Sequence, residues 1–444
     1  MSTHSDGGTV ARMDATHRDA GLLRAVGPWT LASSIICNTV GAGIFAVPGA
    51  LAASVGPYAP WALLLCAFGV GAVAICFAEG GSRIASSGGS YGYMAAAFGP
   101  LAGCVGGTLA WFSNILACGG VAAALADVAA SLLPEPLRAP AHTLVIVLVI
   151  SGIAWINVGG VKHGMRLVNA ATLLKLLPLA VFVIVGAAAV RGENFRQTVE
   201  VSTSGLGRAL ILALFAFTGM ETSLAASGEV AEPARTIPRA LLRAMLVVTL
   251  LYVAIQLIAQ GILGPALATS KVPLADAMAR ISPVLRLLML AGAALSMFGL
   301  MSIELLGGPR ILFAFARDGL LPAALGRVHA RSHAPHVAII CHAVIAMALA
   351  LTGTFAELAV LSTLAVAPLY MGGSIAAWLL ARRGVAASGT PLNFRWLGAT
   401  MVVASVSMLV LIALGSRAEI IGLLVVMTAS VVWYLLSRAL SRRA

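Results

Sequence analysis

Apolar segments of about twenty residues, the length that an α-helix needs to cross a bilayer, recur along the 444-residue chain. Strands of a membrane barrel would instead alternate polar and apolar residues, and these segments do not. The predicted fold class is therefore an all-α integral membrane protein with about 12 transmembrane helices. The expected spans are residues 29–53, 58–81, 100–131, 141–159, 167–190, 208–228, 239–264, 284–310, 336–354, 356–380, 394–414 and 418–437.

The composition agrees with lipid as the solvent. Hydrophobic residues make up 60% of the chain and charged residues only 10%, whereas soluble domains carry about 25% charged residues. The net charge of +12 is spread between the apolar segments, with no basic patch interleaved with aromatic residues. Membrane topology accounts for this spread, because cytoplasmic loops carry an excess of Lys and Arg. No nucleic-acid partner is expected.

The distribution of basic residues predicts the orientation. Of the 28 Lys and Arg residues, 19 fall on one side of the membrane and 8 on the other, with Lys175 inside a span. This asymmetry places both termini in the cytoplasm of a multi-pass protein of the cell (inner or plasma) membrane. Residues 1–27 are polar and are expected to form a disordered cytoplasmic tail without a cleavable signal peptide, and residues 438–444 form a second tail.

Two of the expected spans carry helix breakers in their middle. The stretch "NTVGAGIFAVPG", residues 38–49, has glycines and a proline inside the first span, and "LFAFTGMETS", residues 214–223, places Thr218-Gly219 inside the sixth. The second break comes five spans after the first, and a repeat of five helices must be inserted the other way up. Interrupted helices at matching places in two halves indicate a transporter site near the bilayer midplane.

The breaks suggest what such a site would bind. Unpaired backbone groups cost several kcal/mol in hydrocarbon, so a broken helix persists only where a cavity or ligand satisfies it. The start of a half-helix suits a carboxylate, and its end suits an ammonium. Gly41 and Gly43 lack a Cβ, so a ligand can approach the backbone. Small residues also mark close helix packing, but the matched break at Gly219, with Glu221 beside it, favours binding of an α-amino acid.

Several blocks resemble signatures of amino acid permeases of the amino acid–polyamine–organocation (APC) superfamily. They are "GAGIF", "GGSYGYMAAAFGP" (88–100), "NVGGVKHGMRLVN" (157–169), "FTGMETSLAASGEVAEPARTIPRA" (217–240) and "ARDGLLP" (316–322). The resemblance covers about residues 28–440. It implies the leucine-transporter-like fold, with inverted five-helix repeats at residues 28–190 and 208–380 and two extra helices at residues 394–437.

Within that frame, one group of residues is expected to contact the substrate: Thr39, Gly41, Ala42, Gly43, Ile44, Phe215, Ala216, Phe217, Thr218, Gly219 and Glu304. The resemblance places Phe215 as an aromatic gate, although a lone aromatic in a membrane helix also serves packing. It places Glu304 where relatives close a side chain over the substrate. A carboxylate there would favour a cationic substrate, unless it forms a salt bridge with Arg310 or Lys175.

Two further charges are candidates for proton coupling. Lys175 lies within a span, where desolvation disfavours its ammonium and proton loading becomes feasible. The resemblance places it where sodium-coupled relatives hold a cation, and the alternative is a fixed strut bonded to carbonyls of the first span. Glu221 is either a gating or proton-linked carboxylate or a cap for the broken helix. Glu79 and Arg83 are expected to form an i,i+4 pair at the membrane interface.

The predicted function is secondary active transport of an amino acid by alternating access, with proton coupling. The alternatives are an amino acid or polyamine exchanger without net proton coupling and a non-transporting sensor. No enzyme is expected, because no phosphate-binding loop or nucleophile arrangement occurs. The six cysteines lie in apolar segments without ligand spacing, so no metal or cofactor is expected. The expected partners are the amino acid, a proton and the lipid bilayer, and a homodimer is left open.

Overall fold

The computed structural model describes residues 27–41, 43–84, 89–159, 175–196, 200–224, 230–332, 334–387 and 389–441. This part of the chain is predominantly α-helical, as the apolar periodicity predicts. Its helices are α2 (Pro28–Thr39), α3 (Gly43–Val55), α4 (Ala59–Arg83), α5 (Gly89–Phe98), α6 (Pro100–Ala130), α7 (Glu135–Val158), α9 (Leu176–Gly186), α10 (Thr203–Phe217), α11 (Met220–Leu224), α12 (Pro233–Leu263), α13 (Pro273–Ala279), α14 (Pro283–Arg317), α15 (His336–Thr352), α16 (Phe355–Arg382), α17 (Leu397–Ala413) and α18 (Arg417–Ser441).

The described residues include seven helical segments that are long and apolar enough to cross a membrane. Four shorter apolar helical segments accompany them, at Leu176–Ala189, Thr203–Phe217, His336–Thr352 and Leu397–Ala413. These lengths and compositions confirm a multi-pass, all-helical membrane protein. Of the two expected tails, only Gly27 and residues 438–441 are described. Of the span predicted at 167–190, only residues 175–190 are described.

Several expected boundaries were wrong in one consistent way. The spans predicted to begin at residues 141 and 239 begin at Glu135 and Pro233, and the span predicted to end at residue 310 continues to Arg317. The two added starts carry charged residues and a proline in the first turn, whereas the added end, residues 311–317, is apolar up to Arg317. Hydropathy alone does not register the added starts, although proline favours the first turn of a helix.

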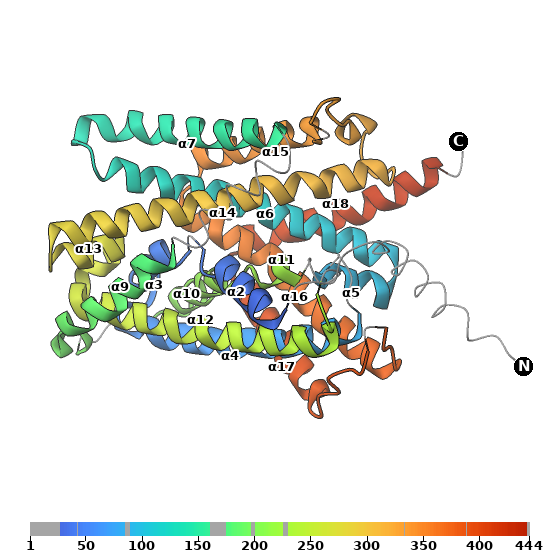
Figure 1. Ribbon diagram of the computed structural model, residues 1–444, viewed down its shortest axis with the longest axis horizontal. Helices are drawn as coiled ribbons and strands as arrows, with labels where there is room; N and C mark the ends of the chain where they lie inside the picture. The colour runs from blue at the N-terminus through green and yellow to red at the C-terminus, as the bar shows by residue number, and fades with distance from the viewer. Residues whose placement is uncertain are drawn as a thin grey trace, which may run out of the picture.

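Long helices flank the short broken ones (Figure 1). In the view of Figure 1, α7 and α15 run along one edge and α4, α12 and α17 along the opposite one. The helices α2, α3, α10 and α11 lie between these edges, and α10 packs against both α3 and α4. On one side α12 packs against α2 and α4, on the other α6 packs against α7, α14 and α15, and α16 contacts both α4 and α6. The broken helices therefore occupy the middle of the molecule.

The expected ion pair of Glu79 and Arg83 forms, but its surroundings differ from the prediction. Arg83 Nε lies 2.8 Å from Glu79 Oε1, and both side chains are buried rather than placed at an exposed interface. Glu79 also accepts hydrogen bonds from the backbone N–H groups of Asn393 and Phe394, and Arg83 donates to the Asn393 side chain. The pair thus anchors the loop between α16 and α17 to the end of α4, which sequence spacing cannot reveal.

Candidate functional site

The first expected break is present between α2 and α3. Helix α2 ends at Thr39, and Val40 and Gly41 are not helical before α3 begins at Gly43. Thr39 and Ile44 are both buried. The hydroxyl of Thr39 has no hydrogen-bond partner among the described residues. Ala42, which the sequence analysis also assigned to the site, lies outside the described residues.

The second expected break is present between α10 and α11. Helix α10 ends at Phe217, and Thr218 then adopts an extended backbone with ψ 158°. Gly219 follows with φ +115°, a conformation that side chains with a Cβ rarely adopt. Helix α11 starts at Met220. Both glycine-containing spans are thus interrupted where the sequence predicts.

The two breaks lie directly against each other. A Cβ atom added at Gly219 would lie 2.8 Å from the backbone oxygen of Asn38, near the end of α2. A Cβ atom added at Gly43 would lie 3.3 Å from Ala216 Cα and 3.5 Å from the ring of Phe215. Glycine at position 219 therefore permits a backbone approach that any other residue would obstruct, and a side chain at position 43 would crowd Ala216. The sequence pattern predicted each break, and the structure brings them together.

A tyrosine that the sequence analysis missed joins the two breaks. The hydroxyl oxygen of Tyr252, on α12, lies 2.6 Å from the carbonyl oxygen of Thr39 and 2.9 Å from that of Ala216. Tyr252 is fully buried, and its ring packs against that of Phe217 at 5.3 Å between centroids. A phenol has one proton, so it can serve both carbonyls only by sharing or alternating that donor. A tyrosine within a largely apolar span was the available signal, although Thr249, Gln256 and Gln260 share that span.

Lys175 reaches the first break from α9. It occupies the residue before the first turn of α9, its side chain is buried, and its ammonium donates a hydrogen bond to the carbonyl oxygen of Cys37. Cys37 belongs to the last turn of α2, whose carbonyls lack partners within the helix. This contact is common to both alternatives from the sequence, a proton carrier and a fixed strut.

Glu221 both caps the second break and links it to α16. One oxygen of Glu221, Oε2, accepts the backbone N–H of Gly219 at 3.0 Å and the hydroxyl of Tyr370 at 2.5 Å. Tyr370 lies on α16 and is buried against Phe77 of α4 with an edge-on ring contact. Of the two alternatives, the cap is observed as a hydrogen bond. The same carboxylate also connects the break to α16, which packs against both α4 and α6.

Glu304 lies on the helix that covers the first break. A Cβ added at Gly41 would lie 3.2 Å from Cδ2 of Leu300, and Glu304 is one turn further along the same face of α14. Its carboxylate accepts a hydrogen bond from the side-chain amide of Asn114 on α6. The alternative of a salt bridge to Arg310 or Lys175 is wrong among the described residues, because neither pair is within 4.0 Å.

Asn114 and Leu300 were not identified from the sequence. The side-chain oxygen of Asn114 is buried and has no partner within the described chain, although its amide is bonded to Glu304. Buried polar atoms are nearly always hydrogen-bonded, so an unpartnered one often marks a place for water or a ligand. Asparagine in a span of small apolar residues was a usable signal, whereas Leu300 carried none.

Phe215 lies at the junction of α3, α10 and α16. Its buried ring makes an edge-on contact with Phe355 at 5.6 Å between centroids and an interplanar angle of 79°. Phe355 begins α16, so the pair joins the last turn of α10 to the start of that helix. The arrangement is compatible with a gate and with packing, the two interpretations that the sequence left open.

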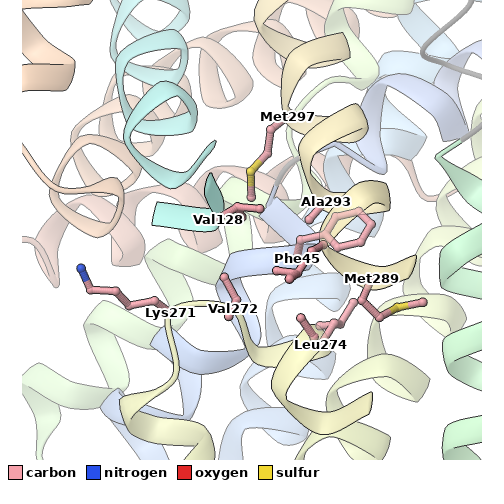
Figure 2. Close-up of a pocket in the computed structure, with 10 residues that line it drawn as sticks. Phe45, Val128, Lys271, Val272, Leu274, Met289, Ala293 and Met297 are labelled. Atoms are coloured by element: carbon pink, nitrogen blue, oxygen red, sulfur yellow. The ribbon is translucent and has the colours of Figure 1, made fainter. Parts of the chain in front are cut away.

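A small apolar pocket lies beside the first turn of α3 (Figure 2). It is lined by residues of α3, α6, α13, α14 and the segment before α13: Phe45, Val128, Lys271, Val272, Leu274, Ala275, Met289, Leu290, Ala293 and Met297. Figure 2 shows Phe45 and Ala293 turned toward one another, while the ammonium of Lys271 extends away from the pocket. The pocket therefore opens next to the break and carries no charge in its interior.

No residues of the described chain gather as a metal site of three or more His, Cys, Asp or Glu side chains. No disulfide joins any of the six cysteines, all of which lie in the described part of the chain. His329 and His336 approach each other at 5.7 Å between ring centroids, edge to face, without a third ligand among the described residues. The polar groups of the site are thus backbone carbonyls and N–H groups with a few side chains around them.

Comparison with known proteins agrees with this architecture. The branched-chain amino acid permease BcaP of Bacillus subtilis is 27% identical over segments covering 73% of this chain and 74% of BcaP. The serine/threonine exchanger SteT of the same organism is 26% identical, covering 82% and 85%. The methylthioribose transporter of Bacillus subtilis is 27% identical, covering 71% of this chain and 72% of that transporter. A family model described as amino acid permease matches residues 26–440. The chain belongs to the amino acid permease family.

Proposed function

We propose that this permease is a secondary active amino acid transporter that binds its substrate between the two helix breaks and works by alternating access. The observation that carries the proposal is the contact of the two breaks, in which Gly219 lies against Asn38 and Gly43 against Ala216. Helix starts attract carboxylates and helix ends attract cations, so paired breaks can hold both charged groups of one zwitterion.

The proposed site has a direction. The first N–H groups of α3, at Gly43 and Ile44, face no intrahelical acceptor and suit the substrate carboxylate. Carbonyls at the end of α10 suit the ammonium, although that of Ala216 already accepts from Tyr252. The two inverted repeats, residues 28–190 and 208–380, with two further helices at 394–437 and both termini in the cytoplasm, complete the proposal.

A binding screen tests whether both charges are recognised. Purified protein should bind one of the twenty amino acids, whereas its methyl ester and its N-acetyl derivative, each lacking one charge, should bind about five- to a hundredfold more weakly, since a buried partner left unpaired costs about 1–3 kcal/mol. Because the relatives include a methylthioribose transporter, this sugar belongs in the same screen. The proposal would be overturned if an uncharged compound binds and none of the twenty amino acids does.

Proton coupling is proposed to run through Lys175. Its ammonium holds the end of α2 through Cys37, and loss of the proton would weaken that bond, because a neutral amine is a poorer donor than an ammonium. We expect an imposed pH gradient to drive uptake into proteoliposomes that contain no substrate. Lys175→Ala should abolish this accumulation, whereas Lys271→Ala, which removes an exposed ammonium paired with Asp127, should leave it unchanged. Unchanged pH dependence in Lys175→Ala rejects the coupling role.

Exchange without net proton coupling is the second candidate. It is favoured by the bond of Lys175 to Cys37, which also fits a fixed strut, and by the likeness to SteT, named as an exchanger. Uptake that requires preloaded vesicles and ignores the pH gradient would support exchange. Uptake into empty vesicles driven by the gradient would support symport, so one preparation decides between them.

Glu304 is proposed to set substrate charge. Glu304→Gln keeps the size of the side chain and its contact with Asn114 but removes the negative charge. Uptake of lysine, arginine or ornithine should fall about tenfold relative to neutral amino acids, because one charged hydrogen bond is worth about 1.5–3 kcal/mol. The matched control is Glu135→Gln at the exposed start of α7. Equal losses for cationic and neutral substrates would argue against this role.

A further inference from the structure

A row of arginines marks one exposed face at the start of α12. Arg235, Arg239 and Arg243 are spaced four residues apart, so they share one side of the helix. All three are exposed. Further along the same side, Leu246 and Leu250 are 62% and 63% exposed. The face therefore changes from basic to apolar within about two turns.

The length of α12 places this change at the membrane surface. Its 31 residues extend about 46 Å at 1.5 Å per residue, whereas the hydrocarbon core is about 30 Å thick. About ten residues must then project beyond the hydrocarbon, and the exposed leucines show which end they occupy. Arg239 and Arg243 accordingly fall at the depth of lipid phosphates, with Leu246 and Leu250 among the acyl chains.

Helix α2 contributes a second wall. It packs along α12, and its residue Trp29 is 73% exposed with its ring 5.4 Å below the guanidinium of Arg243. Tryptophan is enriched at the level of lipid headgroups. A groove between the two helices is lined by Pro28, Ala231, Glu232, Arg235, Thr236 and Arg239. The row of arginines thus borders a recess and not only an open surface.

The charge of the recess favours an anion. Its one carboxylate, Glu232, lies 3.8 Å from Arg235, and both side chains are about three-quarters exposed. Among the described residues, no carboxylate lies within 4.0 Å of Arg239 or Arg243. Two guanidiniums next to the recess thus have no carboxylate partner in the described part of the chain, and guanidinium groups pair strongly with phosphate oxygens.

We propose that this groove binds the headgroup of an anionic phospholipid. Arg239 and Arg243 hold the phosphate, Trp29 flanks the glycerol region, and the acyl chains follow Leu246 and Leu250 along α12. The apolar continuation of the basic face selects a lipid over a soluble phosphate, which would gain nothing from it. Because α2 is the first half of a broken helix, the bound lipid also steadies that half-helix, a consequence that rests on the proposed function.

Lipid titration of the purified full-length protein, followed by native mass spectrometry, tests the site without any transport assay. The probes are phosphatidylglycerol and phosphatidylethanolamine of identical acyl chains. Removing two surface arginines, each worth about 1 kcal/mol towards anionic lipid, in Arg239→Gln/Arg243→Gln should weaken phosphatidylglycerol binding about 30-fold, at tenfold per 1.4 kcal/mol. Each single variant should lose about fivefold, which keeps the test available if the double variant does not fold.

The chain offers a matched control. Arg382 stacks on Trp378 at 5.4 Å and Arg395 on Trp396 at 5.5 Å, so both repeat the arginine-on-tryptophan contact away from the groove. Arg382→Gln/Arg395→Gln removes the same charge and should keep the tightly bound lipid. Equal losses in both double variants, equal binding of phosphatidylethanolamine, or displacement of the lipid by millimolar glycerol phosphate would each overturn the proposal.

Discussion

The two helix breaks satisfy their backbone groups in different ways. At the first break, the carbonyl oxygens of Cys37 and Thr39 are bound by side chains from two other helices, Lys175 of α9 and Tyr252 of α12. At the second break, much of the bonding is local. The hydroxyl of Thr218 donates to the carbonyl of Phe215 at 2.7 Å, and Glu221 accepts the N–H of Gly219.

This difference indicates which break can respond to the rest of the protein. An unsatisfied backbone group costs several kcal/mol in a membrane interior. The second break has partners within its own segment, at Phe215 and Gly219, beside the bonds from Tyr252 and Tyr370, so part of its bonding persists when neighbouring helices move. Tyr252 of α12 serves both breaks, and Thr39 also accepts the N–H of Gly41, but Lys175 of α9 bonds the first break, so a shift of α9 alters the carbonyls of that break. We therefore expect the first break to couple substrate binding to conformational change.

Contact between the breaks should be the most sensitive feature. In Gly219→Ala the new Cβ would lie 2.8 Å from Asn38 O, at a backbone φ of +115°. Strained backbone of this kind costs about 1–3 kcal/mol before any clash is counted. We expect uptake in proteoliposomes to fall about a hundredfold or more. Gly152→Ala on α7, where a Cβ meets nothing within 4 Å, should retain full activity. Normal uptake by Gly219→Ala would mean that the breaks need not touch.

Loss of the shared hydroxyl should have the next largest effect. Tyr252→Phe removes the donor to Thr39 and Ala216 and leaves two buried carbonyls with one partner fewer. The expected loss is about 1–3 kcal/mol of stability, with uptake reduced about tenfold. Thermal unfolding and initial uptake rates measure both.

Tyr93→Phe is the matched control for that prediction. The hydroxyl of Tyr93 is equally buried but has no hydrogen-bond partner in the described part of the chain. Its removal should leave the free energy of unfolding unchanged and the uptake rate within about twofold of the original protein, because no hydrogen bond is lost. Similar effects of the two substitutions would show that bridging of the breaks by Tyr252 carries no special weight.

The local capping of the second break should be the most tolerant of change. Thr218→Ala removes one hydrogen bond to the carbonyl of Phe215, but the backbone N–H of residue 218 still reaches that oxygen at 3.3 Å. Stability should fall by about 0.5–1 kcal/mol and uptake by no more than about threefold. A loss as large as that of Tyr252→Phe would erase the proposed difference between the two breaks.

The sequence predicted the features that depend on local chemistry. Gly41, Gly43 and Gly219 indicated the breaks because glycine adopts non-helical backbone conformations at little cost and has no Cβ to obstruct a close approach. Lys175, Glu221 and Glu304 were identified because charge is rare at membrane depth. The family was predicted from several short sequence blocks, each of which lies within one local stretch of the chain.

The remaining contacts depend on which helices meet. Tyr252 is 213 residues from Thr39, and Asn114 is 190 residues from Glu304. A single sequence does not specify these pairings, so Tyr252, Asn114 and Leu300 were missed, and the Glu79–Arg83 pair was expected at the membrane interface. The sequence signal available for Tyr252 and Asn114 was their polarity within an apolar span, and Leu300 carried no signal.

The most direct measurement is an experimental structure of the full-length protein with the amino acid found by the binding screen. The account predicts the ligand between α2–α3 and α10–α11, with its carboxylate at the N–H groups of Gly43 and Ile44 and its ammonium at carbonyls near the end of α10. A ligand bound away from both breaks, or breaks that wind into continuous helices around it, would contradict the account.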